Sequence, residues 1–147
     1  MTGGASFRVE EASIANIQAA YQAGVTNARA VTQAFLDRIE AYDRRGPALW
    51  AIVMANPDAL SDADVLDRQF AATGEFVGPL HGIPVLVKDN YDVAGMQTTG
   101  GSASLIGWVP KFDAAAVHKL KAAGAIVLAK TSMSEWARGG LDNINSV

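Results

Sequence analysis

The chain has 147 residues, half of them hydrophobic, so it is long enough for one domain with its own core. Its net charge of −3 gives no basic field for nucleic acid or an anionic membrane surface, and we expect neither partner. It has no cysteine, which excludes disulfides, thiolate metal sites and a cysteine nucleophile. It shows no signal pattern and no apolar run of about 18 residues, so we expect a cytoplasmic protein.

Two amphipathic helices are expected first. Ser13 is the predicted N-cap of a short helix with apolar residues at helical spacing, and Gly24 is its predicted end. Thr26 is the predicted N-cap of a longer helix, whose apolar stripe leaves its charged side chains facing water. This second helix should end before the Arg-Arg-Gly-Pro sequence at 44–47.

A strand and a third helix should follow. Trp50, Ile52 and Met54 alternate with small residues, which predicts a half-buried strand. The Asn-Pro pair at 56–57 provides a cap and a first-turn proline for the next helix, which should end at Gly74.

Residues 78–90, G-P-L-H-G-I-P-V-L-V-K-D-N, carry the strongest functional signal. The apolar run at 83–87 predicts a buried strand, with Lys88 at its carboxyl end. An ammonium against apolar packing is poorly solvated, so burial would lower the pKa of Lys88 and make it a candidate base. The alternative is that Lys88 bends into solvent and pairs with Asp89. Position alone leaves both open.

The second half predicts a parallel pair of strands. The connection at 89–112 is rich in Gly, Thr and Ser, and a loop of that length is usually functional or disordered. Asp113 should cap a helix through Ala123, and residues 125–129 should form a second apolar strand, which together suggest a right-handed crossover. Few elements are left to cover these strands, so we expect exposed apolar surface and self-association.

Two ordered blocks resemble the amidase signature family. Residues 78–90 resemble its lysine motif. Residues 113–139, D-A-A-A-V-H-K-L-K-A-A-G-A-I-V-L-A-K-T-S-M-S-E-W-A-R-G, resemble its downstream D-x-x-x-V-x-x-L-x-x-A-G-A-x-x-x-G-K-T-N-x-x-E pattern. The sequence departs at Ala129, where the family usually has Gly, and at Ser132, where it often has Asn. The resemblance runs from about Ser13 to the end.

The resemblance implies an α/β fold in which helices pack around a mixed sheet. The chain would be a single partial domain, with a helical region at 13–74 and a lysine-bearing core at 78–140. The implied activity is hydrolysis of carboxylic amides to a carboxylate and ammonia or an amine. It uses a serine nucleophile, a second serine in a cis peptide and the strand-end lysine, which here is Lys88. A neutral lysine, relayed through the bridging serine, would accept the proton of the nucleophile and return it to the leaving amine.

The resemblance also implies where substrate binds. In this family the turn that corresponds to 131–140 lines the acyl pocket, so Met133, Trp136 and Ala137 are candidate contacts to a small-molecule amide. The alternative is that Met133 and Trp136 simply fill the core. No cofactor is implied. Both family serines lie in a Gly/Ser-rich segment downstream of this block, so we expect a truncated, incomplete domain that is inactive alone.

Two other functions stay open. The glutamine-hydrolysing subunit of the tRNA-dependent amidotransferase typically reads M-D-E-F-A-M-G where this chain reads M-S-E-W-A-R-G, and Ser134 and Arg138 favour a stand-alone amidase. A non-catalytic remnant or interaction module is the hypothesis from another class.

Several further motifs resemble functional sites without matching them. Ser102 lies among glycines but lacks G-x-S-x-G spacing, so we reject it as a nucleophile. Residues 124–131 nearly match a phosphate-binding loop, but their apolar character predicts a strand with a structural Lys130. His81 and His118 lack ligand-like spacing, so we interpret both as surface or loop residues and expect no metal.

Overall fold

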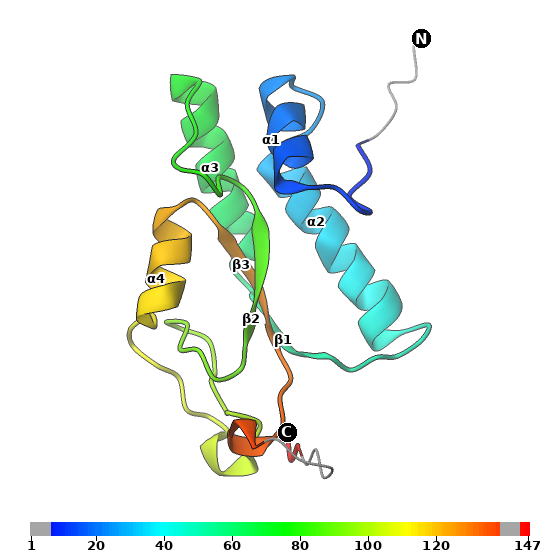
Figure 1. The fold of residues 1–147 in the computed structure, drawn as a ribbon, viewed down its shortest axis with the longest axis vertical. Helices are drawn as coiled ribbons and strands as arrows, with labels where there is room; N and C mark the ends of the chain where they lie inside the picture. The colour runs from blue at the N-terminus through cyan, green and yellow to red at the C-terminus, as the bar shows by residue number, and fades with distance from the viewer. Residues whose placement is uncertain (1–6, 139–144) are drawn as a thin grey trace.

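The computed structural model describes residues 7–138 and 145–147. A mixed three-stranded sheet has β3 at its centre, parallel to β2 and antiparallel to β1 (Figure 1). This confirms the expected α/β class with helices around a mixed sheet. In chain order the elements are α1 (Ile14–Gln22), α2 (Ala28–Arg38), a π-helical turn (Ile39–Arg44), β1 (Ile52–Ala55), α3 (Ala59–Thr73), β2 (Pro84–Lys88), a 3-10 turn (Ala103–Leu105), α4 (Ala115–Ala122), β3 (Ile126–Thr131) and a second 3-10 turn (Glu135–Ala137).

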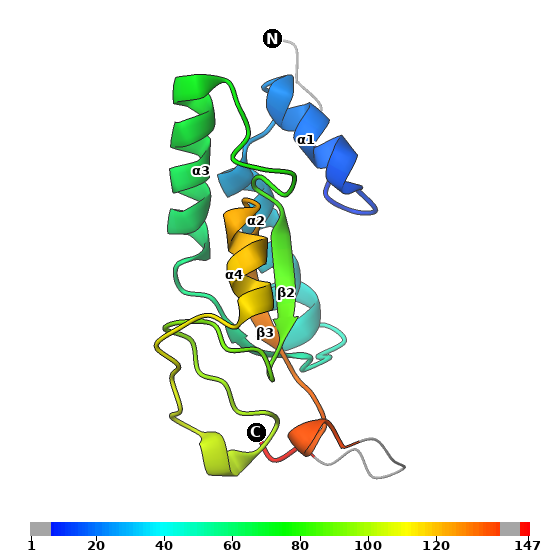
Figure 2. The same ribbon diagram turned by 60° about the vertical axis from the view of Figure 1, so that its left-hand side comes forward.

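The alternation of side chains along β3 divides the core into two parts. Ile126 and Leu128 pack with buried residues of α1, α2 and α3, whereas Val127 packs with Val117 of α4. Figure 2 shows α4 and α2 on opposite sides of the strands. Of the two apolar strands predicted, β3 is buried along almost its whole length. The strand predicted to be buried at 83–87 is instead the edge strand β2, whose Leu86 is 51% exposed.

The predicted start of α1 is confirmed in detail, and that of α2 is wrong by one residue. The Ser13 hydroxyl accepts the N–H of Asn16, and the Asn16 side chain accepts the N–H of Ser13, which completes a capping box. The cap of α2 is Asn27 rather than Thr26, and its carboxamide oxygen accepts a first-turn N–H. Asparagine and threonine both suit this role, so composition did not decide between neighbours.

Two other starts also lie further along the chain than predicted. The strand β1 begins at Ile52, because Trp50 has a φ of +52° and is not extended. The N-cap of α3 is Asp58 rather than Asn56. The side chain of Asn56 accepts the N–H of Asp58 at 2.9 Å and also donates to the carbonyl of Val127 at 2.7 Å, which ties the chain to β3.

The segment from β2 through α4 to β3 forms the expected parallel connection. Its helix is not capped by Asp113, which was predicted to do so. The Asp113 carboxylate accepts a backbone N–H from the preceding loop and pairs with Lys121 at 2.9 Å. It therefore fastens the loop to α4 from the side.

His81 lies in a turn between α3 and β2, but it is buried in the core rather than at the surface, where the sequence also allowed it. Its side chain is 1% exposed and stacks on Phe76 with ring centroids 4.8 Å apart. Its Nδ1 accepts the N–H of Val77 at 3.2 Å. Burial lowers the pKa of His81, and the charge of Asp67 opposes the shift. His118 is exposed, as expected.

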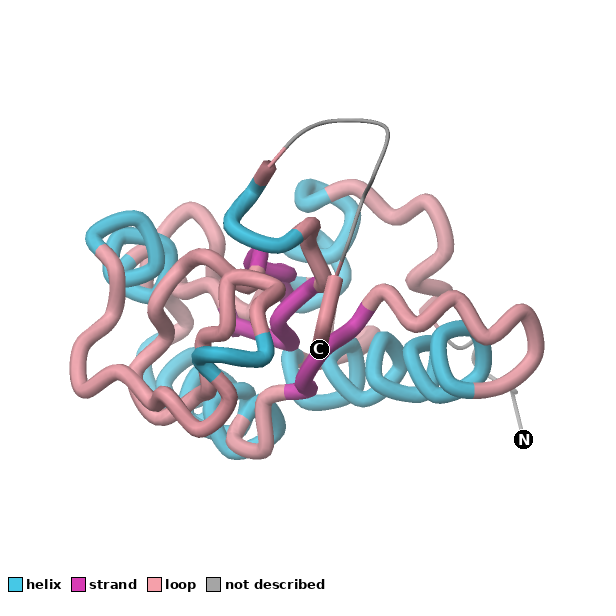
Figure 3. Tube along the Cα trace, turned by 90° about the horizontal axis from the view of Figure 1, so that it is seen from below, coloured by secondary structure: helices cyan, strands magenta, loops and turns pink. Residues whose placement is uncertain are grey.

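The long connection after β2 packs against the turn that follows β3. Figure 3 looks onto this end of the molecule, where the loops gather. Gly101 has a φ of +75°, and a Cβ placed there would lie 2.6 Å from the carbonyl oxygen of Met133. The N–H of Trp136 donates to the carbonyl of Gly100 at 2.8 Å. The two segments therefore form one packed unit.

The buried His81 makes stability depend on pH. Its folded-state pKa lies below the unfolded value of about 6.5, so the unfolded chain binds the proton more readily. The stability that neutral His81 contributes is fully present above pH 6.5. It falls as the pH drops through 6.5 towards the folded-state pKa, by at most about 1.4 kcal/mol per pH unit. Urea unfolding from pH 7.5 to 5 should show this loss, and His81→Gln should remove it. His118→Gln should keep it; a loss that survives in His81→Gln contradicts the assignment.

Gly101 should tolerate no side chain. Gly101→Ala adds both left-handed strain and a clash with the carbonyl of Met133, so we expect a cost of about 2 to 4 kcal/mol. Gly107→Ala is the matched control, because Gly107 has a φ of +86° but open space around it, and it should cost only about 1 kcal/mol. Denaturant unfolding measures both. Equal costs would show that the contact does not constrain the loop.

Candidate functional site

The carboxyl ends of β2 and β3 bring Lys88 beside the turn that follows β3. The two strands are parallel, so they end at the same edge of the sheet, where the loops gather in Figure 1. Lys88 lies opposite Thr131 in the ladder, and the N–H of Asp89 donates to the Thr131 carbonyl at 3.0 Å. The expected turn was 131–140; residues 139 and 140 lie outside the described residues.

The side chain of Lys88 does not have the surroundings predicted for it. It is exposed, and it lies with Leu86 and Tyr91 at a shallow pocket of about 240 Å³ next to α4. The expected burial against apolar packing is therefore absent at Lys88. The alternative was a lysine that bends into solvent and pairs with Asp89. The exposure to solvent holds, but the pair does not form, because Asp89 turns inward and pairs with Lys130.

The three candidate substrate contacts line one pocket of about 250 Å³. Met133 is 6% exposed, so it also serves the core, whereas Trp136 is 61% exposed and does not fill the core. Ala137 completes the group. The pocket is lined by Asn90, Thr98, Gly100, Leu105, Met133, Trp136 and Ala137.

The backbone of this turn is held in an uncommon conformation. Trp136 and Ala137 have φ values of +55° and +56°, in the left-handed region that side chains disfavour. The contact between the Trp136 N–H and the Gly100 carbonyl fixes one of them. Such backbone is maintained only where its surroundings determine it, and it is concentrated at ligand sites.

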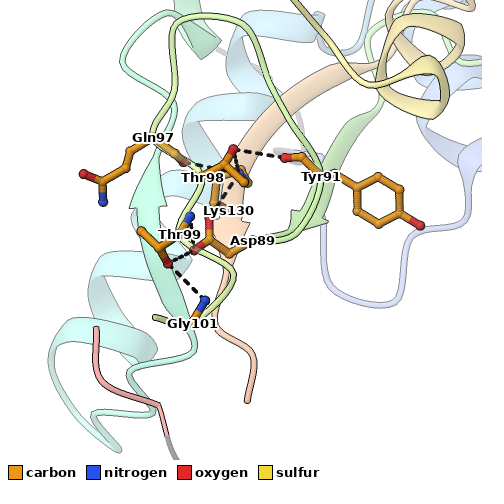
Figure 4. Close-up of polar contacts among 7 residues, drawn as sticks. All are labelled: Asp89, Tyr91, Gln97, Thr98, Thr99, Gly101 and Lys130. Carbon is orange, nitrogen blue, oxygen red and sulfur yellow. Dashed lines mark hydrogen bonds and ion pairs between the residues drawn. The ribbon is translucent and has the colours of Figure 1, made fainter. Parts of the chain in front are cut away.

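A buried ion pair between Asp89 and Lys130 lies behind this edge (Figure 4). Both side chains are fully buried, with Lys130 Nζ 3.0 Å from Asp89 Oδ1. Lys130 Nζ also donates to Thr98 Oγ1 at 2.8 Å and to the Gln97 carbonyl at 3.2 Å. Asp89 Oδ2 accepts the N–H of Thr99 at 3.1 Å and its hydroxyl.

This network agrees with the prediction of a structural Lys130, but Asp89 was missed. Burial lowers the pKa of Lys130, and the hydrogen bond and charge of Asp89 oppose the shift. The sequence did contain a signal: Asp89 directly follows one strand and Lys130 lies near the end of the other, and a parallel crossover brings these strand ends to one edge.

Ser102, rejected as a nucleophile, has its hydroxyl engaged by Ser104 and Glu135. It is 3% exposed, and its Oγ donates to Glu135 at 2.5 Å and lies 2.9 Å from Ser104 Oγ. This arrangement joins the 99–105 loop to the second 3-10 turn and suits a supporting role.

Metal sites and membrane spans are two further features that bear on function. Among residues 7–138 and 145–147, no group of three or more His, Cys, Asp or Glu side chains is placed to hold a metal ion. None of the helices in these ranges is both long and apolar enough to cross a bilayer.

Comparison with known proteins gives the same relationship from sequence and from structure. The amidase family model matches residues 30–142. One subunit of the glutamyl-tRNA(Gln) amidotransferase from Acidothermus cellulolyticus is 46% identical over 114 residues, which are 77% of this chain and 22% of the relative. A probable amidase from Arabidopsis thaliana is 37% identical over 134 residues, 90% of this chain and 26% of the relative.

A solved structure extends the comparison to three dimensions. The peptide amidase from Stenotrophomonas maltophilia is 48% identical and superposes with a TM-score of 0.81, covering 86% of this chain and 26% of that one. The chain thus spans about a quarter of the length of the relatives that it matches. The matched residues include both blocks on which the resemblance was based, and the chain belongs to the amidase family.

Proposed function

We propose that the complete gene product hydrolyses carboxylic amides, with Lys88 as the base of a Ser-cisSer-Lys mechanism. The observation that carries this proposal is the placement of Lys88 beside the turn whose Met133, Trp136 and Ala137 line one pocket. Family membership supports it, because the relatives include a peptide amidase and one subunit of an amidotransferase.

Lys88 has to be neutral to act as a base. In this chain its side chain is exposed, so we propose that the family's Gly/Ser-rich segment covers it and removes it from water, which favours the neutral amine. The amine then accepts the proton of the nucleophilic serine through the bridging serine as the oxygen attacks the amide carbon. The proton passes to the leaving nitrogen when the C–N bond breaks, and water hydrolyses the acyl-enzyme.

The 147 residues alone should hydrolyse no amide. Among the described residues, no serine hydroxyl makes a hydrogen bond to Lys88. The hydroxyls of Ser102 and Ser104 bond to each other, and that of Ser102 also bonds to Glu135. A base without a nucleophile or oxyanion donors cannot supply acyl transfer. If the gene ends at codon 147, the alternative of a non-catalytic module applies.

The substrate class is either a peptide or other stand-alone amide, or glutamine. The 48% identity to a peptide amidase favours the first, and so do Ser134 and Arg138 where the glutamine-hydrolysing subunit typically has Asp and Met. The 46% identity to the glutamyl-tRNA(Gln) amidotransferase favours the second. Assay of the complete gene product with a peptide amide and with glutamine separates them.

Removing the Lys88 amine should abolish hydrolysis. In the complete gene product, Lys88→Ala should lower kcat for a simple aryl amide by about 10³-fold or more, because general base catalysis typically supplies 10²- to 10⁴-fold. Lys119→Ala, which removes an exposed lysine of α4, is the matched control and should leave kcat unchanged. Equal activity of Lys88→Ala and wild type would reject the assignment. Turnover by the 147-residue chain, lost in Lys88→Ala, would refute the inactivity of the fragment.

We also propose that the isolated chain self-associates through exposed apolar side chains. Phe112 is 81% exposed and Trp108 is 55% exposed, both in the long connection. Sedimentation of the 147-residue chain should depend on concentration, and a Trp108→Ser/Phe112→Ser variant should weaken association by about tenfold or more. Val25→Ser, in an exposed turn between α1 and α2, should change little. A monodisperse monomer at all concentrations would count against the proposal.

A further inference from the structure

Among residues 7–138 and 145–147, Asp89 and Lys130 form the one ion pair in which both side chains are fully buried. The other ion pairs in these ranges have at least one partly exposed partner. The amide-hydrolysing mechanism proposed above uses neither residue. A buried carboxylate and ammonium are costly to remove from water, so their presence calls for a reason.

The pair fastens the end of β2, the strand β3 and the long connection to one another. Asp89 directly follows β2, Lys130 lies in β3, and the two together bind the loop at 97–99 through its carbonyl, hydroxyl and N–H groups. Figure 4 shows Lys130 and Asp89 side by side, with Thr98 and Thr99 directed at them. The loop therefore cannot shift along the strand ends without breaking several charge-assisted hydrogen bonds.

The same contacts continue to the pocket. The Thr99 hydroxyl accepts the N–H of Gly101 at 3.1 Å. Gly101 approaches Met133 too closely for any side chain, and the Gly100 carbonyl accepts the Trp136 N–H. On the other side, Asp89 is joined covalently to Lys88. One network thus runs from the proposed base to the residues that line the pocket.

We propose that Asp89 and Lys130 are positioning residues that set the spacing between Lys88 and the 133–137 turn. This inference rests on the proposed function for its catalytic consequence, although the clamp itself is a property of the chain. Neither residue touches the reacting atoms. Their role is to fix where the end of β2 stands relative to the pocket.

A double replacement of a buried ion pair can distinguish a positioning role from a role in stability. Removing one partner leaves an unpaired buried charge and destabilises strongly, whereas replacing both by apolar residues of similar size is often neutral or stabilising. Apolar contacts are not directional, so they would not reproduce the bonds to Thr98 and Thr99. A double apolar variant should therefore fold well and hold the loop poorly.

Hydrogen exchange on the 147-residue chain tests the clamp. In Asp89→Leu/Lys130→Met, the amides of Thr99, Gly101 and Trp136 should exchange at least about tenfold faster, while those of β3 keep their rates. Glu40→Leu/Arg45→Met, which replaces an exposed pair, is the matched control and should change none of these rates. If the double variant does not fold, Thr99→Val tests the same point by removing the hydroxyl between Asp89 and Gly101. Unchanged exchange in the folded variant overturns the clamp.

Activity of the complete gene product tests the catalytic consequence. We expect the folded double variant to lose at least tenfold in kcat and to shift the Lys88-dependent limb of the pH profile while it keeps wild-type thermal stability. Thr99→Val should cause the same loss and shift. Full kcat and an unchanged pH profile despite faster exchange would show a merely structural pair and overturn the positioning role. If wild type shows no Lys88-dependent hydrolysis, the proposed function fails, and the exchange result alone upholds or overturns the clamp.

Discussion

The interaction on which this end of the molecule depends is the contact between one buried ammonium and one buried carboxylate. Burial lowers the pKa of Lys130 and so disfavours its charged form, and the hydrogen bond and charge of Asp89 oppose that shift. Each is satisfied by the other and by the loop at 97–99, so the loop is required for the pair as much as the pair is required for the loop. The pair and this loop therefore link the strand ends to the pocket turn.

Two lysines at the ends of adjacent parallel strands have different surroundings, which suit the different roles that we propose for them. Lys130 lies on the central strand, where both faces of the sheet are covered, and its charge is met inside the protein. Lys88 ends the edge strand and faces solvent. A group that has to take up and release protons needs access to reactants, whereas a group that holds a loop needs a fixed partner. The sheet order supplies both environments side by side.

The sequence predicted the elements well where local chemistry determined them. The Ser13 capping box, the apolar run of β3 and the parallel crossover follow from spacing and turn residues, and the structure contains all three. Predictions were wrong where a side chain had a distant partner. Asn56 accepts an N–H at the start of α3 but also bonds to β3, and Asp113 joins the preceding loop to α4 rather than capping it. No local pattern reveals these distant partners.

The candidate site shows the same contrast between what the local sequence determines and what tertiary structure determines. The two motif blocks located Lys88 and the Met133 to Ala137 turn, and the parallel strands do bring them to one edge. The burial of individual side chains could not be predicted from the sequence. His81 follows a turn-like Gly-Pro-Leu and yet lies in an aromatic cluster, and Lys88 follows an apolar run and yet is exposed. Burial is set by what packs over a residue, which is a property of tertiary structure.

The order Lys-Asp at the end of β2 has a consequence for how this fold can vary. Successive side chains of a strand point to opposite faces, so the outward amine and the inward carboxylate exchange places if β2 slips by a single residue. An insertion or deletion anywhere between His81 and Lys88 would thus leave a carboxylate facing water and drive an ammonium against Lys130, like charge on like. The length of this short strand, and not only its composition, encodes which amine is available for chemistry.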